Sequence, residues 1–135
     1  MARHYTITKG VVYRNNLFDA VSDTGVNTSD SCLVAGARAV SVEFTAENVS
    51  SGNGVFSIEV SMDGGDSWTS YNMLVENTTN TNSEDITRVD EVTLDSNDSE
   101  MLFMDKSTLG GLTHVRVKVD VTTDGDYSAD INICY

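Results

Sequence analysis

Hydrophobic and polar residues alternate with a period of two along most of this chain. The alternation is clearest in four segments, at 40–45, 56–62, 114–121 and 127–135. A weaker version of the same pattern recurs in five shorter segments, at 5–7, 11–13, 68–75, 86–94 and 101–104. One apolar and one polar face is typical of strands in antiparallel sheets that contact water on one side. We therefore predict an all-β fold of about eight strands.

Turn-forming residues separate these segments. Glycine, aspartate and asparagine, which tolerate positive φ, cluster at 51–54, 63–66, 110–111 and 124–126. Polar stretches predict longer loops at 23–31, 77–83 and 95–100. A chain of 135 residues, of which 39% are hydrophobic, suits one core. The pattern predicts a single domain over residues 1–135, folded as an antiparallel two-sheet β-sandwich or jelly roll.

The charge of the chain limits the kinds of partner that we expect it to bind. Eight Lys and Arg residues against 21 Asp and Glu residues give a formal net charge of −13, which disfavours nucleic acid and anionic membranes as partners. Arg3, Lys9 and Arg14 all precede the first acidic residue, Asp19. Residues 1–14 are therefore a candidate basic docking arm for an acidic partner or a neighbouring copy. The alternative is a first strand whose charges balance its own domain.

The sequence also indicates whether the chain is expected to span a membrane, to be secreted or to form a disulfide. The sequence lacks an apolar run of the roughly 18 residues that a membrane span needs, and we expect no secretory leader. Cys32 and Cys134 could form a disulfide if their strands are neighbours, but two buried free thiols are the interpretation that we favour.

The most specific local motif lies at residues 61–68, which read Ser-Met-Asp-Gly-Gly-Asp-Ser-Trp. The motif resembles the Asp-box, a β-hairpin signature of the form S-x-D-x-G-x-T-W, with Ser67 in place of the usual Thr. We expect Asp63 to accept backbone N–H groups across the turn, Gly65 to adopt a left-handed conformation, and Trp68 to pack back over the hairpin that Ser61 begins. In sialidase-like propellers the box is structural, so the resemblance implies no catalytic residue.

Candidate chemistry is otherwise sparse. Calcium could bind at Asp63 with Asp66, or at Asp124, Asp126 and Asp130, although Asp-Gly-Asp is also ordinary turn sequence. The sequence contains no G-x-S-x-G, P-loop or H-E-x-x-H motif, and His114 alternates with valines on a polar face. We expect neither an enzyme nor a bound cofactor or resident metal.

The order of segments along the chain resembles a known family. A short strand at 3–10 precedes Asn-Leu-Phe-Asp-Ala at 16–20, the alternating strand at 40–44, the hairpin at 58–68, Thr-His-Val-Arg-Val at 113–117, and a last strand ending at 135. This order is similar to small β-sandwich structural proteins of tailed bacteriophages. The resemblance implies a capsid decoration (cement) protein, or a head–tail or tail accessory subunit, on the virion surface after synthesis in the host cytoplasm. Implied partners are the major capsid protein, other virion subunits, and further copies of the chain in a homo-oligomer such as a trimer.

Two other functions fit the same pattern. The first is a carbohydrate-binding module, although the sequence does not place two or three aromatic rings on one face; quenching of Trp68 fluorescence by sugars would favour it. The second is a self-assembling subunit of a tail, tube or extracellular filament, joined by strand donation from the N-terminus. In the capsid interpretation, the loops at 51–54, 77–83 and 95–100 form outward or intersubunit surfaces.

Overall fold

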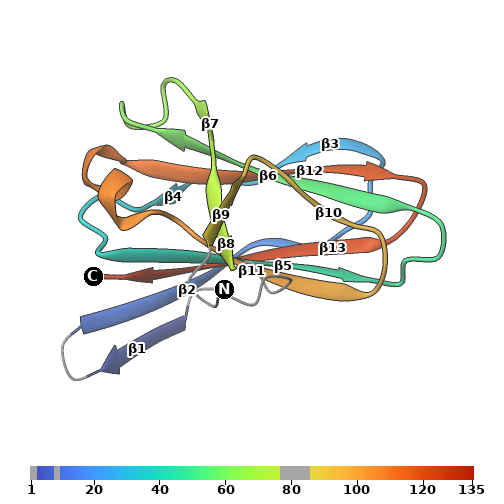
Figure 1. Cartoon of the computed structure of the whole chain (residues 1–135), viewed down its shortest axis with the longest axis horizontal. Coiled ribbons are helices and arrows are strands. Elements are labelled where there is room, and N and C mark those ends of the chain that lie inside the picture. Colours follow the sequence, from blue (N-terminus) through green and yellow to red (C-terminus); the bar gives the residue numbers. More distant parts are fainter. Residues whose placement is uncertain (1–2, 8–9, 77–85) are drawn as a thin grey trace.

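The computed structural model describes residues 3–7, 10–76 and 86–135, and shows two antiparallel sheets packed as a β-sandwich (Figure 1). One sheet has seven strands, in the order β1-β2-β13-β5-β11-β8-β9. The bounds of these strands are β1 Arg3–Ile7, β2 Gly10–Val21, β13 Asp126–Cys134, β5 Ala39–Glu47, β11 Asp98–Phe103, β8 Met73–Glu76 and β9 Ile86–Val89.

The second sheet has six strands, in the order β10-β6-β12-β3, with β4 also pairing with β12 and β7 with β6. Its strands are β10 Val92–Leu94, β6 Asn53–Ser61, β12 His114–Thr122, β3 Gly25–Thr28, β4 Cys32–Leu33 and β7 Thr69–Tyr71. A short 3₁₀ helix, η1 (Lys106–Gly111), leads into β12. No helix among the described residues is long and apolar enough to cross a membrane.

Four nine-residue strands, β5, β6, β12 and β13, form the centre of the sandwich and carry the clearest alternation of the sequence. Their inward residues are buried, and Phe44 of β5 stacks on Phe56 of β6 with ring centroids 4.3 Å apart. Tyr127 lies edge-on to Phe56 and is fully buried. The core therefore follows directly from the period of two.

The sandwich fold confirms the prediction, but the number of strands was wrong: the described chain has thirteen rather than about eight. Two predicted strands are each divided between the sheets. The segment 68–75 contains β7 of one sheet and β8 of the other, and 86–94 likewise contains β9 and β10. Alternation within a segment does not specify the strand with which each part pairs, so these crossings between sheets could not be read from the pattern.

Three of the predicted loops also need correction. The segment 23–31 contains β3, the segment 95–100 contains the start of β11, and 51–54 contains the first residues of β6. β3 has the sequence Gly-Val-Asn-Thr, and it is a strand because β12 supplies its backbone partners, in spite of its polar side chains. The loop at 77–83 lies outside the described residues.

Candidate interaction faces

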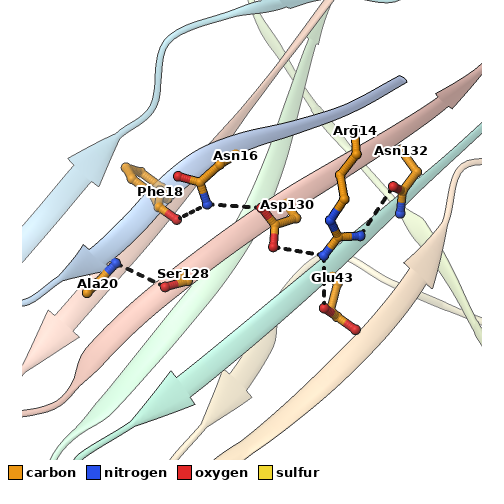
Figure 2. Close-up of polar contacts among 8 residues, drawn as sticks. All are labelled: Arg14, Asn16, Phe18, Ala20, Glu43, Ser128, Asp130 and Asn132. Carbon is orange, nitrogen blue, oxygen red and sulfur yellow. Dashed lines mark hydrogen bonds and ion pairs between the residues drawn. The ribbon is translucent and has the colours of Figure 1, made fainter. Parts of the chain in front are cut away.

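The outer face of the seven-stranded sheet carries a network of polar side chains around Arg14, which we call the Arg14 network (Figure 2). From β2, the Arg14 guanidinium donates to Asp130 on β13 at 2.9 Å and to Glu43 on β5 at 3.3 Å. It also donates to Asn132 Oδ1 at 3.2 Å. Glu43 and Asp130 are direct cross-strand neighbours, and like charges in that arrangement repel. Arg14 therefore offsets a repulsion that the sheet itself creates.

The same network satisfies backbone groups where β2 becomes irregular. The pairing of β2 with β13 shifts register twice, between Asn16 and Phe18 and between Phe18 and Val21, as in a β-bulge. Asn16 Nδ2 donates to the Phe18 carbonyl at 2.9 Å and to Asp130 Oδ1 at 2.9 Å (Figure 2). The Ala20 N–H, at a residue with φ of 53°, donates to Ser128 Oγ. Side chains thus replace ladder hydrogen bonds that the bulge removes.

These contacts place one residue of the predicted docking arm. Arg14 lies in β2, which is paired with β1 on one side and β13 on the other, and its ion pairs are with its own domain. The backbone of Arg3 lies in the edge strand β1, while Lys9 lies outside the described residues. Among the described residues of the segment 1–14, only those of β1 therefore lie at the edge of the sheet.

An apolar hollow adjoins the Arg14 network on the same outer face. It has a volume of about 220 Å³ and is lined by Val12, Ala39, Val40, Ser41, Phe103, Asn132 and Cys134. Phe103 is 46% exposed and its neighbour on the same face, Met101, is 47% exposed. Two large apolar side chains on the polar side of a strand depart from the expected alternation. That departure was the available sign of this hollow, and our sequence reasoning missed it.

The Asp-box-like hairpin joins β6 to β7 in the six-stranded sheet. Asp63 Oδ1 accepts from the Ser67 N–H at 2.9 Å and from Ser61 Oγ at 2.7 Å, and Oδ2 accepts from Ser67 Oγ at 2.5 Å. These hydrogen bonds, led by that from the Ser67 hydroxyl, lower the pKa of Asp63 to about 2. Gly65 has φ of 97°, and Trp68 Nε1 donates to its carbonyl at 3.1 Å. The motif therefore forms a closed turn, in which the Asp63 carboxylate accepts hydrogen bonds from residues of the turn itself.

Trp68 has a further partner on β12. The Arg116 guanidinium lies over the indole ring, 4.2 Å from its centroid, and Arg116 Nε donates to Glu59 Oε1 at 2.8 Å. A guanidinium held in this way gains from cation–π attraction as well as from the ion pair. The ring face beneath Arg116 is not open to a sugar, so the geometry does not favour Trp68 as a stacking platform.

Three other calcium candidates, Asp124, Asp126 and Asp130, accept hydrogen bonds in turns or ion pairs. Asp124 accepts from the hydroxyl of Ser50 and from the backbone N–H of Gly52, and the Ser50 contact is the main cause of its lowered pKa. Asp126 accepts from Asn48, and Asp130 from Arg14. No three His, Cys, Asp or Glu side chains gather into a metal-binding group within the described ranges.

Both cysteines are free thiols. Cys32 is buried on β4, and burial raises the pKa of its thiol although Asn15 Nδ2 contacts the sulfur at 3.2 Å. Cys134 is partly exposed at the apolar hollow. His114, on the polar side of β12, contacts Thr113 Oγ1 through Nδ1 at 3.1 Å.

Comparison with known proteins supports the fold over its full length. No protein-family model matches the chain, and no curated protein matches it. Among solved structures, the crystal structure of SPBc2 prophage-derived protein YomS is similar, with a TM-score of 0.59 and 17% sequence identity. The match covers 97% of this chain and 99% of that chain. The chain thus shares its all-β fold, nearly end to end, with a prophage-derived protein.

Proposed function

We propose that this chain is a structural subunit of a bacteriophage particle and that it decorates the outer surface of the capsid shell. The observation that carries the proposal is the fold shared with a prophage-derived protein over almost the whole of both chains. The net charge of −13 agrees with it, because a charged surface keeps an abundant particle protein from aggregating. In such a role, affinity comes from many symmetric weak contacts rather than from one deep site.

The edge strand β1 is the part of the chain that we propose to contact the shell. Among the described strands it pairs with β2 alone, so one of its edges is open for backbone hydrogen bonds. An extended segment of a shell protein could add to that edge, as peptides add to open sheets in other complexes.

Quantitative mass spectrometry of density-purified phage particles tests the proposal. The number of copies of this chain is compared with that of the major shell protein. A ratio near one, or a simple fraction of it, would support decoration of the shell, whereas a few copies per particle would overturn decoration and favour a tail or portal subunit. Absence of the chain from the particles would overturn the virion function altogether.

A truncation tests the contact through β1. Deleting residues 1–9 removes β1 but leaves β2, which pairs with β13 from Val12 onward, and retains Arg14. We expect the truncated chain to fold, as shown by an unchanged far-UV circular dichroism spectrum, and to be missing from particles. Particles that retain it in wild-type amount would contradict a role for β1 in attachment. A deletion as long as 1–14 would not be informative, because it removes the Arg14 network as well.

A further inference from the structure

The outer face of the six-stranded sheet forms a regular series of cross-strand rows, which we call the β12 face. In every row a β12 residue pairs with a β6 residue, and in three rows a residue of β3 or β4 also pairs with the other side of β12. The five rows are Val26–Asp120–Val55, Thr28–Lys118–Ser57, Leu33–His114–Ser61, Arg116–Glu59 and Thr122–Asn53.

Charge distinguishes this face from the outer face of the seven-stranded sheet. It carries two cations, Arg116 and Lys118, and two carboxylates, Glu59 and Asp120, so it is formally neutral on a chain of net charge −13. The opposite outer face carries Glu43, Glu47, Asp126 and Asp130 against Arg14 alone in its four central strands. Two copies of this chain therefore repel one another less through their β12 faces than through the outer faces of their seven-stranded sheets.

The β12 face also has exposed apolar side chains and charged side chains that form no ion pair. Val26 is 63% exposed and Leu33 is 55% exposed. Within the described part of the chain, the side chains of Lys118 and Asp120 have no hydrogen-bond or ion-pair partner, whereas Arg116 is already held by Glu59 and Trp68. A partner with one carboxylate and one cation could therefore form ion pairs with Lys118 and Asp120.

We propose that this chain forms a two-fold symmetric dimer through its β12 face. A two-fold axis that crosses β12 at Val119, perpendicular to the strand and in the plane of contact, reverses the direction of β12 in the second copy. Lys118 of each copy then faces Asp120 of the other, and the two Val26–Asp120–Val55 rows lie beside the axis. The same rotation places Val26 and Val55 of each copy over Thr28 and Ser57 of the other, so the valines lose contact with water. The face is thus complementary to itself in charge, as a contact between identical patches requires.

The Arg116–Trp68 pair lies further along β12, two residues beyond Lys118. Its guanidinium is already fixed by Glu59, so little side-chain entropy remains to be lost when a second copy covers it. Trp and Arg that are held in place before binding are frequent among the residues that dominate interface energetics.

Charge reversal in the purified full-length chain tests the dimer independently of any phage particle. Sedimentation velocity should give a species of twice 14.6 kDa that dissociates on dilution. Asp120→Lys places two like-charge contacts in each dimer, and at about tenfold each the dissociation constant should rise about a hundredfold. Lys118→Glu should do the same, and the double variant Lys118→Glu/Asp120→Lys should restore wild-type association.

The matched control is Asp126→Lys, which makes the same change of charge on the opposite face. General repulsion between acidic molecules predicts that Asp120→Lys and Asp126→Lys both strengthen association, whereas the proposed contact predicts that Asp120→Lys alone weakens it. A second pair of variants keeps the test decisive if a charge variant fails to fold. Val26→Asp, on the β12 face, should weaken association more than Met101→Asp, on the opposite face. A monomer at every concentration, equal effects on the two faces, or no restoration in the folded double variant would overturn the dimer. These outcomes leave the particle proposal untouched.

Discussion

Replacing Arg14 by Met should destabilise the sandwich, because it removes the bridge between two acidic neighbours while keeping the apolar part of the side chain. Arg14 and its partners Asp130 and Glu43 are between 25% and 31% exposed at their side chains. Fully exposed ion pairs contribute about 0.2–1 kcal/mol, and hydrogen bonds to charged groups in buried sites about 1.5–3 kcal/mol. For this intermediate site we expect a loss of about 1–2 kcal/mol, to which the unbridged repulsion contributes.

Urea unfolding followed by far-UV circular dichroism and by the fluorescence of Trp68 measures the effect. With a urea dependence of about 2 kcal/mol per molar, the middle of the usual range for small domains, the midpoint should fall by about 0.5–1 M. Part of the loss should disappear at high salt, which screens the repulsion between the two carboxylates. The double variant Arg14→Met/Asp130→Asn should be less destabilised than the sum of the two single variants.

Lys106→Met is the matched control, because it removes one positive charge from an exposed residue of η1. If the loss of stability came only from the greater net charge, the Arg14 and Lys106 variants would behave alike. An Arg14→Met midpoint within error of the wild type, or additive effects of Arg14→Met and Asp130→Asn, would refute the role that we assign to Arg14.

Two further predictions concern the packing of the core and the hairpin. A Cβ at Gly54 would lie 2.5 Å from Cδ1 of the buried Tyr127 ring, so Gly54→Ala should cost about 1–3 kcal/mol in urea unfolding, whereas Gly110→Ala, in open space, should leave the midpoint unchanged. Because folding lowers the pKa of Asp63 from 3.8 to about 2, its contribution to stability is complete above pH 3.8 and is lost as the pH falls through about 2. Acid titration of Trp68 fluorescence should therefore show a transition centred near pH 2 in the wild type, and its amplitude should be reduced in Asp63→Asn.

Sequence reasoning succeeded where structure depends on neighbours along the chain. The period of two in β5, β6, β12 and β13 identified the buried residues, because successive side chains of a strand point to opposite faces whatever the strand pairs with. The hairpin at residues 61–68 was predictable for a similar reason, since all the contacts that lower the pKa of Asp63 come from within the motif.

The arrangement of side chains on the two outer faces depended on the tertiary structure. Arg14 was expected to be part of a docking arm, and its ion pairs with Glu43 and Asp130 appear only when β2, β13 and β5 lie side by side. Lys118 and Asp120 are ordinary polar positions in the sequence, and the neutral face that they share with Val26 exists because β3 pairs with β12 across about 90 residues of chain.

By itself, then, the sequence determined the class of fold, the inward-facing residues and the one closed turn, each of which follows from interactions over a few residues. Pairing between distant segments decided the rest. It set the strand order, the division of two segments between the sheets, and the grouping of charges on each outer face. The free energy of that pairing depends on how well all the strands pack together in one core, and no local pattern records it.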